Sequence, residues 1–392
     1  MLVKNNSYYK YLCFFLIFIF IPQFLIVLNI NVDYFKYLRF LTPLFILYFL
    51  VFDKKFFNNI DSNLSYLFSI KLIKFYLLIS ILTILTSLFL FNAVFSFRNI
   101  VNIILLVTPV FYFIFISVKL NSIQINKLLK FLFWLNFFIY LFSLISSGVS
   151  FSSLIDSIFS FDFVNSDVDT ESTSSLYFCF FVLFFLSKKN YKLFFFALFL
   201  TVIGGKRIAI LASLFSSFVY LLLINYKILL NYLNSNLFKY IFSFLLLICG
   251  NLWFLLYSGY FDNVIQDYTG LSSNAFFMGR LSIAGEFFNY KPDEFDFFLG
   301  YGVGYVDNVL YNFANVERLF HNDFLRFILE FGSFFFFIWV FIHLKFITIS
   351  PLAFSNFILI LVLMQTDNVF LYEIAMYIFY SILSYSLILY KK

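Results

Sequence analysis

The sequence predicts an all-α polytopic integral membrane protein with about twelve transmembrane helices and one large extracytoplasmic loop. Of its 392 residues, 63% are hydrophobic and only 12% are charged, and the mean hydropathy is +0.96. Apolar runs of roughly 18 residues or more recur along the chain. These runs lack the alternation of apolar and polar residues that a transmembrane barrel requires. A soluble two-domain protein is therefore excluded.

The predicted spans follow directly from the apolar runs. The first run comes after Lys4 and Lys10 and is too long for the core of a cleavable signal peptide, so it should remain as a helix. The spans are expected at residues 11–30, 38–51, 72–91, 100–118, 128–146, 174–186, 193–203, 208–225, 238–258, 324–344, 351–366 and 369–389. The sixth and seventh spans are separated at Lys188 and Lys189, because two charges in mid-membrane would cost more than two short helices.

The lysines orient these spans. If the N-terminus is cytoplasmic, the loops on its side contain Lys54, Lys55, Lys71, Lys74, Lys119, Lys127, Lys130, Lys188, Lys189, Lys192, Lys227, Lys239, Lys345, Lys391 and Lys392. The loop at 147–173, on the opposite side, carries several acidic residues and no cation. Cytoplasmic loops are enriched in basic residues, so the sequence predicts that both termini are cytoplasmic.

The arginines show a different distribution. All of them fall on the predicted outer side, at Arg39, Arg98, Arg207, Arg280, Arg318 and Arg326. A guanidinium group binds phosphate oxygens with two parallel hydrogen bonds, which a lysine does not reproduce. This distribution favours a phosphate-bearing lipid as ligand. Chance combined with helix anchoring is the alternative explanation.

The spans divide the chain into three parts. Residues 1–258 contain nine N-terminal transmembrane helices, and residues 324–392 contain three C-terminal ones. Between them, residues 259–323 form a large extracytoplasmic loop. A loop of this length in a compact protein is usually functional.

Two cationic motifs are candidate anion sites. Lys206 and Arg207 follow two glycines at the predicted outer start of the eighth span, where a helix N-terminus adds N–H groups and a positive dipole. Arg280 lies in the segment 276–288, whose apolar residues recur every three to four positions and predict an amphipathic helix on the membrane surface. For each motif the alternative is an ordinary cation at the membrane boundary.

Two further motifs lie in the large loop. Gly300, Gly302 and Gly304 do not follow a buried strand, so they predict a tight turn that approaches substrate or another loop, and not a dinucleotide site. His321 precedes Asn322 and Asp323, which are expected to cap and begin the tenth span. A neutral imidazole there can accept a proton. A capping or interfacial histidine is the equal alternative.

The remaining polar residues of the C-terminal part have structural interpretations. Glu330 lies within a span and is expected to pair with Arg326 one turn earlier. Asp367 and Glu373 could orient an arginine near the outer turn between the last two spans. His343 is expected at the inner membrane boundary, without an assigned function.

The sequence predicts no metal and no cofactor. The cysteines, at Cys13, Cys179 and Cys249, lie in apolar runs without paired spacing. The carboxylates of the large loop have no recognisable ligand spacing; they are Asp262, Asp267, Asp293, Glu294 and Asp296. The formal charge of +6 is explained by the topology lysines, so nucleic-acid binding is not expected.

Taken in order, these motifs resemble the O-antigen polymerase and O-antigen ligase superfamily of bacterial envelope glycosyltransferases. The matching residues are Gly205-Lys206-Arg207 opening a helix, Gly279-Arg280, the glycine turn at 300–304, and His321-Asn322-Asp323-Phe324-Leu325 followed by Glu330-Phe331-Gly332. The resemblance covers the C-terminal half. The sequence departs from the commoner pattern at Lys206, where a serine often stands, and at Ile283 and Ala284, where many relatives carry tryptophan.

The resemblance implies a GT-C-like, metal-independent, inverting transferase in the bacterial inner membrane, with its active site on the periplasmic side. Its donor would be an undecaprenyl-diphosphate-linked oligosaccharide, and a chain-length regulator in the same membrane is a possible partner. By the same resemblance, Arg207 and Arg280 would bind the diphosphate, assisted by Lys206, Gly302, Gly304 and Asn322. His321 would activate the acceptor hydroxyl.

Several functions are compatible with these motifs. A polymerase is preferred over a ligase that transfers the glycan to lipid A-core, because the composition and length suit a strain-variable polysaccharide locus. A flippase or other transporter would place ionisable groups near the membrane midplane, whereas the polar residues here gather at one face. A non-catalytic assembly partner would tolerate alanine at Arg207, Arg280 and His321.

Overall fold

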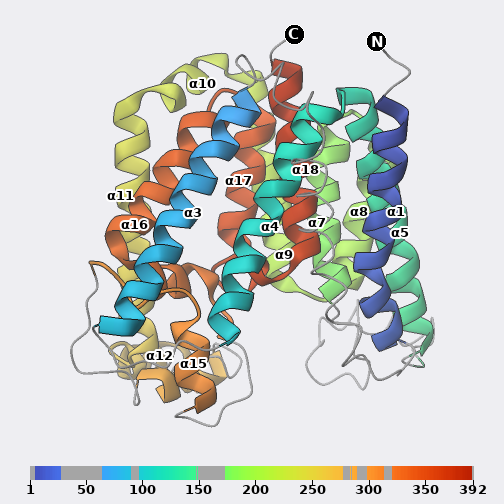
Figure 1. Ribbon diagram of the computed structural model, residues 1–392. Coiled ribbons are helices and arrows are strands. Elements are labelled where there is room, and N and C mark those ends of the chain that lie inside the picture. Colours follow the sequence, from blue (N-terminus) through green and yellow to red (C-terminus); the bar gives the residue numbers. More distant parts are fainter. Residues whose placement is uncertain are drawn as a thin grey trace.

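The structure is a computed structural model, and it describes residues 5–27, 64–89, 97–146, 148, 173–276, 283, 285–288, 298–312 and 320–390. These residues form helices and no strand (Figure 1). Seven of the described helices are long and apolar enough to cross a membrane, and four shorter apolar helices accompany them. The prediction of an all-α membrane protein is confirmed at this level.

The helices pack side by side into one bundle. In chain order, the described helices are α1 (Asn5–Val27), α3 (Leu64–Phe89), α4 (Phe97–Lys119), α5 (Ser122–Ser146), α7 (Thr173–Ser187), α8 (Tyr191–Ile203), α9 (Arg207–Asn225), α10 (Lys227–Asn234), α11 (Asn236–Tyr257), α12 (Asp262–Thr269), α13 (Ser273–Phe276), α15 (Tyr305–Asn312), α16 (Asp323–Ile347), α17 (Pro351–Leu363), the 3₁₀ helix η2 (Val369–Leu371) and α18 (Glu373–Tyr390). The long helices run between the two ends of the bundle. The start of α1 and the end of α18 lie at the same end (Figure 1).

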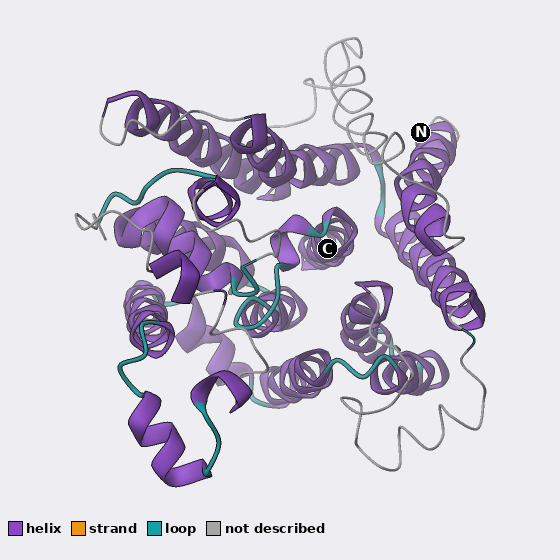
Figure 2. Ribbon diagram, turned by 90° about the horizontal axis from the view of Figure 1, so that it is seen from below, coloured by secondary structure: helices purple, strands orange, loops and turns teal. Residues whose placement is uncertain are grey.

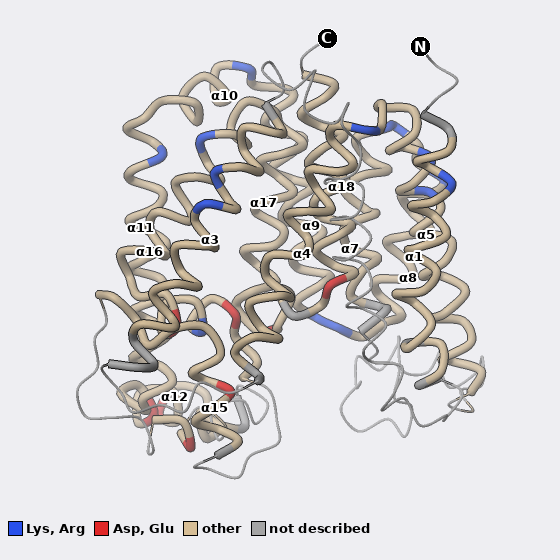
Figure 3. Tube along the Cα trace, viewed as in Figure 1, with Lys and Arg blue, Asp and Glu red and all other residues tan. Residues whose placement is uncertain are grey.

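The two ends differ in charge. One, which we call the lysine end, contains α10, the end of α4 with Lys119, and the α7–α8 turn with Lys188. The other, which we call the acidic end, contains α12, α15 and the start of α16 with Asp323. Figure 3 shows the lysines and arginines gathered mainly at the first end and the acidic residues at the second. This is the separation that the lysine distribution predicts.

The arginines follow the predicted asymmetry where they are described. Arg98 lies in the first turn of α4, Arg207 begins α9, and Arg326 lies in the first turn of α16. All three of these helix starts lie at the acidic end (Figure 1). The others, Arg39, Arg280 and Arg318, lie outside the described residues.

Most predicted spans coincide with described helices. The span at 38–51 lies outside the described residues. The last predicted span, 369–389, is wrong at its start, because η2 and α18 are separated at Tyr372, where the backbone is not helical. The N–H of Phe370, in the first turn of η2, donates to the Asp323 carboxylate at 2.7 Å.

The central helices are surrounded by protein. α18 packs against α4, α5, α7 and α17, and its end lies near the middle of the bundle in the end-on view of Figure 2. Nearly every residue of α17 and α18 is buried. α11 is at the periphery, where 17% of its spanning window is buried, and its apolar side chains therefore suit a lipid environment.

A break in α16 determines the geometry of the acidic end. Gly332 has φ 77° and ψ 161° inside this helix, a conformation essentially restricted to glycine. The segment 298–302 lies against the break: Tyr301 N–H donates to Leu329 O at 3.0 Å, and Gly302 N–H donates to Glu330 O at 2.8 Å. Phe334 N–H donates to Phe298 O at 3.3 Å. The loop therefore replaces hydrogen bonds that the broken helix loses.

Alanine at Gly300 or Gly332 should strongly destabilise the protein. A Cβ at either position would lie 2.3 Å from a backbone atom of the other segment, and both residues have positive φ. We expect a loss of roughly 3 kcal/mol or more in the free energy of unfolding, measured by thermal unfolding in detergent. Gly270→Ala is the matched control, because Gly270 also has positive φ but has open space around it. Equal stability of Gly300→Ala and Gly270→Ala would contradict the packing argument.

Candidate functional site

A buried charge cluster lies directly beneath the glycine turn. Arg326 Nε donates to Glu330 Oε1 at 3.1 Å, and Arg326 Nη2 donates to Asp307 Oδ2 at 2.8 Å. All three side chains are at most 6% exposed. The predicted pairing of Arg326 with Glu330 is confirmed. The part played by Asp307, which comes from α15, is not apparent from the sequence.

Side chains from α3 and α4 complete this cluster. Asn102 Nδ2 donates to Asp307 Oδ2 at 2.9 Å, and Asn99 Nδ2 donates to Val303 O at 2.7 Å. Thr83 Oγ1 accepts from Val303 N–H at 3.0 Å. Asn99 and Asn102 are three residues apart and therefore share one face of α4. Two asparagines at this spacing in an apolar run were the sequence signal for this contact, and the sequence analysis missed it.

Gly302 and Gly304 are buried in this arrangement. Gly302 is bonded to α16, and a Cβ at Gly304 would lie 3.1 Å from Asn102 Nδ2 and from Asn99 Cα. The predicted tight turn is present. It approaches α16 and α4, and these contacts occupy the space around both glycines.

A second polar cluster joins three elements at the acidic end, and we call it the junction. Lys206, the N-cap residue of α9, forms an ion pair with Asp367 at 3.2 Å. Tyr372 OH donates to the other carboxylate oxygen of Asp367 at 2.9 Å. Burial, and next the negative charge of Asp367, raise the pKa of Tyr372 well above its usual value. Among the described residues, the cationic partner of Asp367 is Lys206 and not the expected arginine.

The start of α16 forms the other side of the junction. Asn322 is the N-cap residue, and its Oδ1 accepts from Leu325 N–H at 2.8 Å, as the sequence predicts. Asp323 begins the helix and donates its backbone N–H to Asp367 O at 3.3 Å. His321, which is partly exposed, directly precedes this cap. The start of α9, through Lys206, and the start of α16, through Asp323, therefore both contact Asp367 in the turn after α17.

Several buried polar atoms at the junction have no hydrogen-bond partner among the described residues. They are Asn322 Nδ2, Asp323 Oδ1, Thr366 Oγ1 and both polar side-chain atoms of Asn368. Leaving such a group unpaired costs about 1–3 kcal/mol. A cluster of them in one place is typical of a site that holds water or ligand groups.

The predicted diphosphate residues have different positions. Arg207 begins α9, its side chain is exposed, and it forms no ion pair with any residue that the structure describes. Lys206 is already paired with Asp367. Arg280 lies outside the described residues, as does most of the predicted amphipathic segment 276–288. Its described residues Ile283 and Phe287 are buried.

An aromatic cluster fixes this part of the loop to the helices. Phe287 packs edge-on against Tyr305 and Phe320, and the Tyr301 and Tyr305 rings stack with centroids 4.4 Å apart. Tyr257 at the end of α11 contacts Phe320. Aromatic pairs of this kind contribute about 0.5–1.5 kcal/mol beyond area burial, so the loop is held firmly in front of α16.

A cavity of about 450 Å³ opens at the same end of the bundle. Its polar lining includes Asp262, Gln266, Ser273 and Asn274, and Tyr257 contributes to its wall. Carboxylate, amide and hydroxyl groups are suitable partners for sugar hydroxyls. The acidic end therefore combines an exposed arginine, a histidine and a polar cavity.

His343, expected near the inner end of its span, is buried within the bundle. It is 1% exposed, its Nδ1 lies 2.9 Å from Trp339 O, and its ring stacks on Phe357. The reason is that α16 packs this turn against α17 and α3. His343 is thus a core residue.

Replacing Arg326 should destabilise the protein far more than replacing Arg207. Arg326→Gln leaves two buried carboxylates without their cation, and we expect a loss of roughly 3–5 kcal/mol in the free energy of unfolding. Arg207→Gln changes an exposed residue and should cost less than about 0.5 kcal/mol. Thermal unfolding in detergent measures both. Equal stability of the two variants would show that the charge cluster is not a structural element.

We compared the chain with known protein families, curated proteins and solved structures. No protein-family model, no curated protein and no solved structure matches this chain. A functional assignment therefore depends on the chemistry of the junction and on the motifs that form it.

Proposed function

We propose that this protein is an O-antigen, or surface polysaccharide, polymerase. It would join oligosaccharide repeat units carried on undecaprenyl diphosphate, as a metal-independent inverting glycosyltransferase. The observation that carries the proposal is the junction, where the start of α9 with Lys206 and Arg207 meets the His321 turn through Asp367 and Asp323. Transfer of a glycosyl group from a lipid diphosphate needs a cationic group to stabilise the leaving diphosphate and a base to accept the proton of the attacking hydroxyl.

The proposed orientation places the lysine end in the cytoplasm. Lysine-rich loops favour the cytoplasmic side, and both described chain ends lie there (Figure 1). The junction would then face the periplasm at the outer surface of the bacterial inner membrane. This orientation assumes that residues 38–51 form an additional span, which gives about twelve spans in a GT-C-like arrangement.

Donor binding is assigned to Arg207 together with Arg280. Because the charge of Lys206 is already compensated by Asp367, Arg207 is the cation available at the start of α9. A guanidinium group and a helix N-terminus both favour phosphate oxygens. Neutralising the diphosphate makes it a better leaving group, which is the role that a metal ion has in many other transferases.

Acceptor activation is assigned to His321. Its imidazole would take the proton of the attacking sugar hydroxyl while the new bond from that oxygen to the anomeric carbon forms. The bond from the anomeric carbon to the diphosphate breaks, and the lipid diphosphate leaves on the opposite side, so the configuration inverts. Asn322 Nδ2, which has no hydrogen-bond partner among the described residues, would donate to a sugar oxygen or a water. Gly302 and Gly304, buried against α16 and α4, would contribute by positioning this helix start.

Replacement of Arg207 should reduce polymer formation without reducing protein amount. We expect Arg207→Ala to lose about 10²- to 10³-fold in turnover, as for other lost transition-state donors. Arg207→Lys should recover little, because a point charge does not reproduce the planar fork. The assay is polymer formation by purified protein from the lipid-linked repeat unit of a deletion strain. Lys227→Ala, an exposed cation at the other end, is the control. Full activity of Arg207→Lys would refute bidentate binding.

Replacement of His321 should affect chemistry and leave donor binding intact. His321→Ala is expected to lose roughly 10²- to 10⁴-fold in turnover, while the affinity for the lipid-linked donor stays the same. Wild-type activity should survive EDTA. Loss of activity in EDTA with recovery in magnesium would overturn the metal-independent mechanism.

The phenotype of a gene deletion separates polymerase from ligase. Lipid A-core carrying a single repeat unit is expected for a polymerase. Complete loss of surface repeats would instead identify a ligase.

A further inference from the structure

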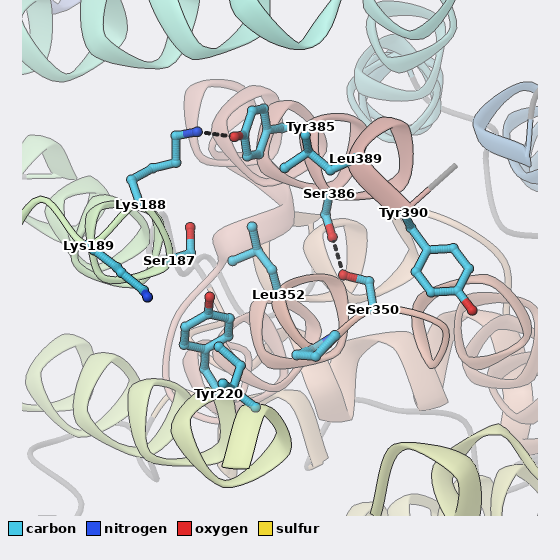
Figure 4. Close-up of a pocket in the computed structure, with 12 residues that line it drawn as sticks. Ser187, Lys188, Lys189, Tyr220, Ser350, Leu352, Tyr385, Ser386, Leu389 and Tyr390 are labelled. Carbon is cyan, nitrogen blue, oxygen red and sulfur yellow. Dashed lines mark hydrogen bonds between the residues drawn. The ribbon is translucent and has the colours of Figure 1, made fainter. Parts of the chain in front are cut away.

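A cavity at the lysine end is distant from the proposed catalytic junction. Its volume is about 460 Å³, within the range of about 300–1,000 Å³ that is usual for small-molecule sites. Four elements form it: the α7–α8 turn, α9, the start of α17 and the end of α18 (Figure 4). The polar residues that line it include Lys188, Lys189, Tyr220, Ser350 and Tyr385.

Two lysines of the α7–α8 turn reach this cavity. Lys188 Nζ donates to the Tyr385 hydroxyl and lies 4.6 Å from the centroid of the same ring. Lys189 has φ 55°, a left-handed conformation that is uncommon for a residue other than glycine. Figure 4 shows the Lys189 side chain directed toward the Tyr220 hydroxyl side of the cavity. None of the described residues that line the cavity is acidic.

The N-terminus of α17 adds positive potential. Its N-cap residue, Ser350, forms no capping hydrogen bond, and its hydroxyl is paired with Ser386 instead. Pro351, the first residue of α17, has no N–H, and the N–H groups of Leu352 and Ala353 receive no side-chain cap from Ser350. The start of a helix with such N–H groups favours anions.

Tyr220 independently indicates a ligand. Its side chain is 8% exposed, and its hydroxyl forms no hydrogen bond with any residue that the structure describes. The hydroxyl points into the cavity (Figure 4). Because this hydroxyl faces the cavity, it is available as a donor to a group that enters there.

The rim of the cavity is apolar. Ile224 and Leu389 line it and are 45% and 43% exposed, and Leu352 lies deeper. Ile224 and Leu389 belong to the last turns of spanning helices α9 and α18, which is the level where lipid headgroups meet acyl chains. A soluble phosphate would gain nothing from these side chains.

We propose that this cavity binds the phosphate headgroup of an anionic phospholipid from the leaflet at the lysine end, with the acyl chains along Ile224 and Leu389. Lys188, Lys189, the Tyr220 hydroxyl and the first turn of α17 surround the phosphate. Ordinary lysines at a membrane boundary would extend to water, whereas Lys188 is held against Tyr385. The proposal is independent of the glycosyltransferase assignment.

The test is native mass spectrometry of the purified full-length protein with phosphatidylglycerol, phosphatidylcholine and soluble glycerol 3-phosphate as probes. Wild type should bind phosphatidylglycerol in preference to the zwitterionic lipid. Lys189→Gln and Tyr220→Phe should each weaken this binding about tenfold or more, as expected for a lost hydrogen bond to a charged group. Lys192→Gln, an exposed lysine two residues beyond the turn that does not line the cavity, should leave it unchanged.

Two results would overturn the proposal. Equal phosphatidylglycerol binding by wild type, Lys189→Gln and Tyr220→Phe would show that the lipid does not occupy this cavity. Displacement of the lipid by glycerol 3-phosphate at comparable concentration would show that a soluble phosphate is the ligand. Thermal unfolding without added lipid shows that each variant is folded, and Tyr220→Phe keeps the ring that packs in the bundle.

Discussion

The break in α16 is possible because residues 298–302 supply hydrogen bonds at the point where the helix is interrupted. No water is available inside a bilayer to satisfy a free backbone group, so a break needs a protein partner. The close approach of Gly300 and Gly332 provides this partner, since neither has a side chain to keep the two backbones apart. The position of the loop, and with it Asp307 beside Arg326, depends on this contact.

Charge burial at the acidic end follows from the same contact. With Asp307 brought to α16, Arg326 has two carboxylate partners, and Asn102 satisfies the carboxylate from α4. Removing one partner of a buried ion pair is strongly destabilising because it leaves an uncompensated charge. In this cluster Arg326 Nη1 has no partner among the described residues. The charge cluster and the loop thus support each other, whereas Arg207 is exposed and His321 is partly exposed.

The sequence predicts those features that depend on residues close to one another along the chain. The apolar runs locate the helices, the Asn322 cap is local, and the pairing of Arg326 with Glu330 spans four residues. The contacts of Asn102 with Asp307 and of Lys206 with Asp367 join residues 205 and 161 positions apart. Such contacts depend on which helices become neighbours, and hydropathy contains no information about that choice. The interruption at Tyr372 is likewise absent from the sequence prediction, because the predicted span runs through it.

The shortness of α8 has a consequence for the surrounding membrane. Its 13 residues extend about 20 Å at 1.5 Å per residue, whereas the hydrocarbon core of a bilayer is about 30 Å thick. Phe195 and Phe199 on this helix are exposed and face outward, while Lys189 and Arg207 flank its two ends. If α8 crosses the membrane, as the sequence predicts, the two leaflets would be closer together along this wall than elsewhere. The thinnest part of the membrane would then connect the lysine-end cavity with the junction.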